Sequence, residues 1–138
     1  MEITTPRGTL TGDSIEDILA RHGLDCLNGA DLSNTDLHGV NLCGIDLTGA
    51  DMHGANLTGA SLDCAILVNA SLINVNMSNA SMCSANLSSA NLTNADMSWS
   101  DLDGANLTGT DLYYADLTGA PKPPRQTVAL TRPASPTT

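Results

Sequence analysis

The chain has 138 residues, enough for one domain, and it contains no Phe, one Trp and two Tyr. So few aromatic rings argue against an irregular globular core, and the interior must instead be narrow, regular and built from Leu, Met and Ala. The formal net charge is −10 at pH 7, and the longest apolar stretch, residues 65–68, is far too short for a membrane span or a signal peptide.

The acidic charge is concentrated in the middle of the chain. Residues 22–121 contain eleven Asp but no Glu, Lys or Arg, so this stretch has a formal charge of −11 with His neutral. A body of this sign repels nucleic acid and anionic membranes and attracts a partner with a basic surface, so we expect no direct binding to nucleic acid or membrane. Without a signal peptide we expect a cytoplasmic protein whose four Cys are reduced thiols.

Residues 1–24 are predicted to form an N-terminal cap that contains a short helix. Ser14 is a favourable N-cap residue, and Gly23 follows a helix expected over residues 15–22. Three apolar residues share one face of this helix: Ile15, Ile18 and Leu19. We expect that face to cover the first coil of the repeat structure, because the end of a solenoid otherwise exposes core and unpaired backbone.

A five-residue repeat begins at Ala30 and runs to Gly119 without an insertion, which gives 18 pentapeptides. The third residue of each pentapeptide, which we name the centre, is always Leu or Met. A small or β-branched residue, mostly Ala, stands two places before the centre, and Asp, Asn or Ser usually stands between them. The last two residues are mostly Gly, Ser, Thr or Asn. Residues 25–29 fit as a degenerate nineteenth copy.

A period of five matches neither an α-helix nor a long strand. The two apolar positions of each repeat lie two residues apart, which fits a short extended segment with both side chains on one face. The two residues that follow favour a tight turn. Repetition of this unit winds the chain into a coil with Ala and the centres inside and Asp and Asn outside. The expected core includes Leu32, Leu47, Leu67, Leu87 and Leu107.

The pattern A(D/N)LXX, present as ANLTG, ADLTG and similar units, resembles the pentapeptide-repeat family over most of the chain. The resemblance implies an all-β fold, a right-handed quadrilateral β-helix with four pentapeptides in each coil. Residues 25–120 would then form the β-helix, in which the 18 regular pentapeptides make about 4.5 coils and residues twenty positions apart stack in columns. Many members of this family have no assigned activity, so the resemblance supplies no partner.

Two acidic columns are candidates for an interaction surface. One column holds Asp31, Asp51 and Asp111, and the column on the next face holds Asp36, Asp96 and Asp116. These carboxylates either form a free acidic surface or bind the backbone of neighbouring coils. Six apolar residues interrupt the polar exterior: Ile66, Val68, Ile73, Trp99, Tyr113 and Tyr114. They mark contact sites if they converge, and are ordinary surface residues if they are scattered.

The sequence favours neither catalysis nor a bound cofactor. The Asp residues occupy equivalent, solvent-facing places, whereas acid–base catalysis needs carboxylates in contrasting environments. Cys43, Asp63, Cys83 and Asp103 fall in one column, but Cys43 and Cys83 would lie two coils apart, too far for a disulfide or a compact metal site. We therefore expect unlinked surface thiols. His38 and His53, just after two centres, are interpreted as exposed polar residues.

Residues 121–138 contain five of the six prolines and are predicted to form a disordered tail or a linker. Three of the five basic residues lie in this segment, so one alternative is that it rests against the acidic rod. The sequence offers no cap for the last coil. A second alternative is therefore that a further copy of the chain pairs with this end to form a homodimer, with the aromatic residues nearby in the contact.

Three functions are compatible with these patterns. The first is a non-enzymatic acidic scaffold that binds a protein partner. The second is a DNA mimic that binds or protects DNA gyrase or another topoisomerase, as some members of the family do; against it, those members resemble Phe-centred repeats, and this chain has no Phe. The third is a repeat appendage of a larger effector or regulatory protein. The identity of the partner does not follow from the sequence.

Overall fold

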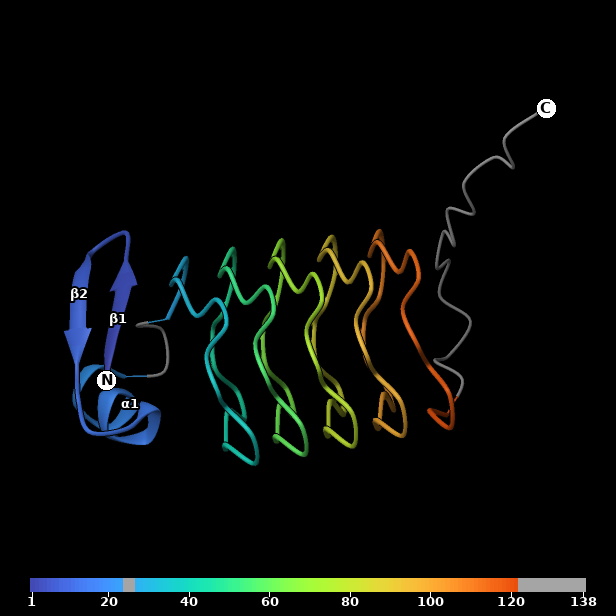
Figure 1. Ribbon diagram of the computed structural model, residues 1–138, viewed down its shortest axis with the longest axis horizontal. Coiled ribbons are helices and arrows are strands. Elements are labelled where there is room, and N and C mark those ends of the chain that lie inside the picture. The colour runs from blue at the N-terminus through green and yellow to red at the C-terminus, as the bar shows by residue number, and fades with distance from the viewer. Residues whose placement is uncertain (24–26, 122–138) are drawn as a thin grey trace.

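The computed structural model describes residues 1–23 and 27–121. A small unit of two strands and one helix lies at one end, and the repeat coils stack beside it along the long axis (Figure 1). The predicted tail lies outside the described residues except for Pro121, and so does the start of the degenerate repeat. No helix in the described ranges is long and apolar enough to cross a membrane.

The coils are held in register by parallel bridges between residues twenty positions apart. The first such pair is Asp31 with Asp51, and the last is Asp96 with Asp116. A spacing of twenty residues places four pentapeptides in each coil. Each residue before a centre therefore stacks on its counterpart in the next coil, which is the column arrangement expected from the family resemblance.

The backbone of each pentapeptide in the inner coils is paired with the coils on both sides. The Leu67 N–H donates to the Asn86 carbonyl at 2.7 Å, and the Asn86 N–H returns a bond of 2.9 Å to the Ala65 carbonyl. Because the same pair of bonds recurs from repeat to repeat, each short extended segment is paired without belonging to a long strand. This is why a repeat with only one strand-like segment forms a continuous ladder.

A tight turn closes every pentapeptide. The Ala60 N–H bonds the carbonyl of the centre Leu57 at 3.0 Å, and Gly59, the last residue of the repeat, has φ of +64°. A positive φ at this place is the signature of a type II turn, which favours Gly and tolerates Asn. The non-glycine residues found at this place with positive φ are Asn34, Cys64, Asn69, Asn74, Asn79, Ser84, Ser89, Asn94, Trp99 and Tyr114.

The core is one continuous cluster, in which the centres and the small residues two places before them stack on their counterparts in the next coil. Every centre from Leu27 to Leu112 is at most 7% exposed, and the preceding small residues are equally buried over most of the rod. The five centres named from the sequence are at most 1% exposed. Buried hydroxyls in place of Ala bond to backbone carbonyls, as when Thr110 donates to Leu87 at 2.8 Å. The last centre, Leu117, is only partly buried.

The N-terminal unit contains a hairpin that the sequence analysis does not predict. Strands β1 (Glu2–Thr5) and β2 (Gly8–Thr11) are antiparallel, and Thr4 of β1 forms an antiparallel bridge with Asp31 of the first coil. Helix α1 (Ile15–His22) follows and covers the expected range. The Ser14 hydroxyl accepts a bond of 3.2 Å from the Asp17 N–H at the start of α1.

The unit and the coils share one hydrophobic core. Ile3 of β1 is 1% exposed, and Ile18 of α1 is fully buried. Both belong to the same cluster as the centres, with Leu19 packed against it. The edge of the first coil is thus covered by a strand as well as by the helix.

Candidate interaction surface

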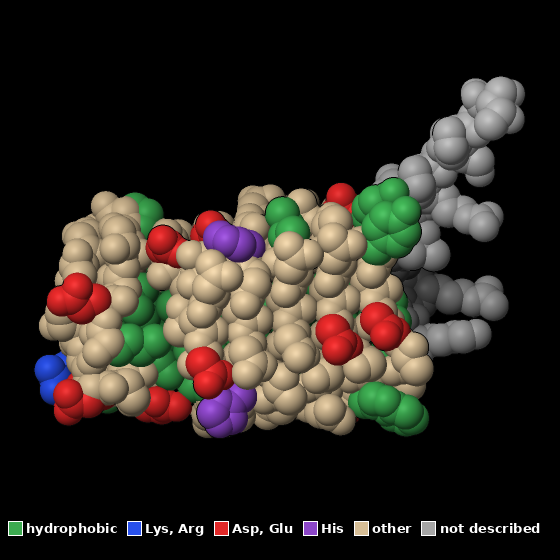
Figure 2. Space-filling model, viewed as in Figure 1, with side chains coloured by type: hydrophobic (Ala, Val, Ile, Leu, Met, Phe, Trp, Pro, Cys, Tyr) green, Lys and Arg blue, Asp and Glu red, His purple; other side chains and the backbone are tan. Residues whose placement is uncertain are grey.

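The bridges place the six candidate carboxylates in two neighbouring columns. In the first column, Ser71 and Asn91 lie between the acidic residues, and in the second column Asn56 and Asn76 do so. The two members at the C-terminal end of the second column, Asp96 and Asp116, are direct neighbours. Figure 2 shows acidic side chains spread along the face in view, with His but no Lys or Arg side chain among them over the described coils.

Each of these carboxylates accepts the backbone N–H of its own turn, whereas one of the two alternatives drawn from the sequence was a bond to the backbone of a neighbouring coil. Asp36 also accepts from the Asn56 side chain of the next coil at 3.0 Å. Asp96 Oδ1 accepts from the Ser98 N–H at 2.9 Å and from the Ser98 hydroxyl at 2.6 Å. The physical reason is distance: the N–H two residues ahead is the nearest free donor at the corner, as in an Asx turn. One carboxylate oxygen is used in the turn, and Oδ2 is left for contact with solvent or a partner.

These bonds favour the ionised form of several of the carboxylates. The Ser33 hydroxyl and N–H lower the pKa of Asp31, and the His38 side chain and N–H lower the pKa of Asp36. The Thr118 hydroxyl and N–H lower the pKa of Asp116 in the same way. Donors aimed at a carboxylate stabilise its charge. Asp31, Asp36 and Asp116 therefore hold their negative charge into mildly acidic conditions.

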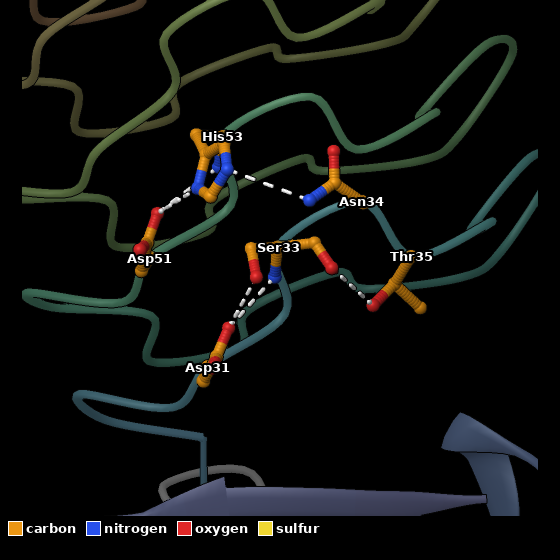
Figure 3. A network of polar contacts seen from close by, with 6 residues as sticks. All are labelled: Asp31, Ser33, Asn34, Thr35, Asp51 and His53. Atoms are coloured by element: carbon orange, nitrogen blue, oxygen red, sulfur yellow. Dashed lines mark hydrogen bonds and ion pairs between the residues drawn. The ribbon is translucent and has the colours of Figure 1, made fainter.

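Polar side chains also connect the first two coils near the N-terminal end. His53 Nδ1 lies 3.1 Å from Asp51 Oδ1, and its Nε2 lies 3.4 Å from the Asn34 amide of the coil before (Figure 3). Just below this contact, the Ser33 hydroxyl donates a hydrogen bond to the Asp31 carboxylate. The exposed His53 side chain thus contacts Asp51 of the acidic column as well as Asn34 of the coil before.

The apolar departures fall in two regions. Ile66 is 39% exposed, and Val68 on the same face is half-buried. Ile73 is also half-buried and belongs to the following pentapeptide, at the next corner of the coil. These three residues therefore extend around the rod instead of forming one compact patch.

The aromatic residues occupy two successive corners near the C-terminal end. Trp99 is 66% exposed and Tyr114 is 72% exposed, although they occupy turn positions with φ of +59° and +57°. The Tyr113 and Tyr114 rings are in contact, with centroids 4.0 Å apart. The Trp99 ring lies over Gly119 of the next coil, where a Cβ atom would stand 2.5 Å from Trp99 Cδ2.

The aromatic corners flank the face that carries Asp96 and Asp116. Tyr113 and Tyr114 immediately precede that face in the chain, and Trp99 follows its centre Met97 at the opposite edge. Figure 2 shows hydrophobic side chains at both edges of the face toward the C-terminal end. These residues stand out in the sequence as apolar departures, and their arrangement around one face follows from the spacing of twenty residues.

The cysteine column contains no compact ligand set. Asp63 Oδ1 accepts from the Ser81 hydroxyl at 2.6 Å and from the Cys83 N–H at 2.9 Å. Cys43 Sγ lies 2.9 Å from the Ser61 hydroxyl. Within the part of the chain that the structure describes, no three His, Cys, Asp or Glu side chains lie close enough to hold a metal ion.

A small groove not foreseen from the sequence lies where the N-terminal unit meets the first coil. Its lining includes Asp13, which precedes the N-cap of α1, Glu16 from the first turn of α1, and Asp36 and His38 from the coil. Sequence periodicity gives no signal for this groove, because it forms between the repeat and a segment outside the repeat.

The fold and surface define a class of protein: a repeat solenoid that presents columns of side chains along a rod. A model of pentapeptide repeats matches residues 26–63, 65–104 and 90–120 with 8 copies, and the chain belongs to this family. Pentapeptide-repeat proteins form right-handed quadrilateral β-helices. No curated protein sequence matches the chain significantly.

Two solved structures resemble about two-thirds of this chain. HetL, a pentapeptide-repeat protein involved in heterocyst differentiation regulation in the cyanobacterium Nostoc sp. strain PCC 7120, is 40% identical with a TM-score of 0.65 over 68% of this chain and 45% of its own. A thylakoid-lumen pentapeptide-repeat protein of Arabidopsis thaliana is 32% identical with a TM-score of 0.63 over 65% of this chain and 63% of its own. This chain thus spans less than two-thirds of either relative.

A third structure matches the chain with low similarity. QnrB1, a plasmid-mediated fluoroquinolone resistance protein, is 16% identical over 70% of this chain and 69% of its own, with a TM-score of 0.31. A similarity this low carries no argument about the function of this chain.

Proposed function

We propose that the protein is a non-enzymatic scaffold that binds a partner protein with a basic surface through its two acidic columns. The observation that carries the proposal is that residues 22–121 present eleven Asp and no Lys or Arg. The pKa values of Asp31, Asp36 and Asp116 are lowered by their turn bonds, so these three carboxylates keep their charge in mildly acidic conditions. A rod of about 4.5 coils, closed at its N-terminal end by β1 and α1, holds the charges at fixed spacing.

A triple variant tests this proposal. Replacing Asp36, Asp96 and Asp116 by Asn removes three charges, while the amide oxygen still accepts the turn bonds, as Asn56 and Asn76 occupy the same column. We expect the variant to lose basic partners that the wild-type protein recovers from a lysate of its source. Asp13→Asn, outside the columns, is the matched control. Recovery of the same partners in equal amounts by the triple variant would overturn the proposal.

A second candidate function is DNA mimicry, in which the rod binds DNA gyrase or a related topoisomerase in place of DNA. The uninterrupted acidic body of the chain favours it. A supercoiling assay with purified gyrase, with and without a quinolone, tests it directly. Inhibition or protection by the wild-type protein that is lost in the triple Asn variant would support mimicry, and no effect on supercoiling would exclude it.

A third candidate function is that of a repeat appendage of a larger effector or regulatory protein. Both similar structures belong to longer chains than the segment matched. Immunoblotting of the endogenous protein compares its mass with the 14.2 kDa of this chain. A clearly larger mass would favour the appendage, and a mass near this value would argue against it.

A further inference from the structure

Two of the three aromatic residues, Trp99 and Tyr114, occupy backbone positions that do not favour a bulky side chain. Among the described residues at positive φ, Trp99 and Tyr114 are the only aromatic ones. A bulky side chain is disfavoured in this backbone region, by about 1–2 kcal/mol for a left-handed residue. Both side chains are also mostly exposed, so burial does not offset this cost. The pairing of backbone strain with exposed rings points to a contact made outside the chain.

The rings and two carboxylates surround one flat stretch of the rod, which we name the aromatic end site: Asp96, Trp99, Tyr113, Tyr114 and Asp116. Asp96 and Asp116 are bridged neighbours in the middle, and the rings stand at the two edges. One face is a single pentapeptide wide, which is at most about 17 Å for five extended residues. A partner segment of about five extended residues would therefore cross the face from one ring to the other.

The chemistry of the aromatic end site matches cationic side chains. A guanidinium or ammonium group is attracted to the face of an aromatic ring, and Arg also pairs with carboxylates through two parallel bonds. Asp96 and Asp116 each bind their own turn through Oδ1, which leaves Oδ2 for such a pair. The rod offers no internal cation for these groups, because residues 22–121 contain no Lys or Arg.

We propose that the aromatic end site docks a short, extended, Arg-bearing segment of the partner protein. This inference rests on the proposed scaffold function and deepens it, because it assigns the specific contact to one end of the rod. The acidic columns then supply long-range attraction, and the rings supply the localised contact.

A charge-neutral double variant separates these two contributions. Trp99→Gly with Tyr114→Gly removes the two most exposed of the three rings, one at each edge of the face, and keeps every charge. Gly suits both turn positions, as Gly39, Gly59 and Gly54 show in the same columns. The probe is a fluorescein-labelled poly-arginine peptide, with binding followed by fluorescence anisotropy on the full chain. We expect the Kd to rise about tenfold or more. Thermal unfolding, measured in parallel, should show no loss of stability in the variant.

Asn79→Gly, at the Trp99 corner one coil earlier, is the matched control and should bind like the wild type. Equal, salt-dependent binding by the wild type and the double variant would overturn this inference and leave the acidic scaffold standing, because charge alone would then account for binding. Failure of every chain to bind the peptide would overturn both.

The basic segment after Pro121 is tested in the same experiment. A full-length variant with Lys122→Gln, Arg125→Gln and Arg132→Gln removes its charges. If ring-dependent binding of the peptide occurs only in this variant, the chain's own segment occupies the site. That result would overturn the assignment to an external partner.

Discussion

Leu67 illustrates how much a buried centre contributes to the stability of the rod. Its side chain is fully buried, and its column neighbours Leu47 and Leu87 are also fully buried. Replacing it by Ala leaves a cavity that rigid neighbouring coils cannot close. We therefore expect Leu67→Ala to lower the free energy of unfolding by about 2–5 kcal/mol in urea titrations. Val68→Ala, at a half-buried outer position, is the control; a loss well under about 1 kcal/mol for Leu67→Ala would contradict the assigned interior.

Asp116 shows how the turn bonds make stability depend on pH. The Thr118 hydroxyl and N–H lower its pKa below the ordinary value of 3.8 in the folded protein. A lowered folded pKa means that this contribution to stability is present above about pH 4 and is lost as the pH falls through the folded pKa. Because Asn accepts the same bonds without titrating, Asp116→Asn should lose less stability than the wild type between about pH 5 and pH 3.

Thermal unfolding followed by circular dichroism at both pH values measures this difference. Asp116→Ala is the useful comparison, since it lacks an acceptor and should be less stable than Asp116→Asn at both values. An identical acid sensitivity in the wild type and Asp116→Asn would show that the turn bond does not stabilise the charged form.

Single residues differ in how far the sequence predicts them. The position of every centre follows from a strict period, because the interior accepts only one kind of side chain there. The partner of an outer carboxylate does not follow, because an Asp at a corner has donors available both in its own turn and in the next coil. The aromatic end site does not follow from local sequence, because Trp99 and Tyr114 lie 15 positions apart. Only the winding of the coil places them at the two corners that bound one face.

At the scale of elements, α1 depends on its N-terminal cap. The Ser14 hydroxyl accepts from the Asp17 N–H, which has no partner within the helix. Ser14→Ala should cost about 1 kcal/mol and speed amide hydrogen exchange in residues 15–22. Ser14→Asp restores an acceptor and should restore protection. Exchange in the central coils should not change; a matching loss there would mean that α1 and the coils unfold as a single unit.

The helix could be predicted from the sequence and the hairpin could not. Ser14, Gly23 and the apolar spacing between them are local signals of a helix. Strands β1 and β2 have only four residues each, too few for an alternating pattern to stand out. Their stability comes from Ile3 in the shared core and from the bridge of Thr4 to Asp31, which are both long-range contacts.

At the scale of the whole molecule, the period predicts a coil but not its cross-section. A coil with a different number of pentapeptides per turn would also bury the centres, so the period alone does not give that number. The value of four came from the family resemblance. The bridges between residues twenty apart give that value independently. Stacking of equivalent residues then has an electrostatic consequence, because Asp51 lies on Asp31 and Asp116 lies on Asp96.

Charge repulsion along the rod should make its stability increase with salt. Stacked carboxylates lie about 4.8 Å apart, and residues 22–121 supply no Lys or Arg to balance them. The screening length falls from about 30 Å at 0.01 M salt to about 10 Å at 0.1 M. We therefore expect the Tm to rise with NaCl over this range, and Asp96→Asn to raise the Tm at low salt and to weaken the response. Asp13→Asn, outside the stacked pairs, should leave the response nearly unchanged. A Tm that falls with NaCl would mean that attractive ion pairs outweigh the repulsion between coils.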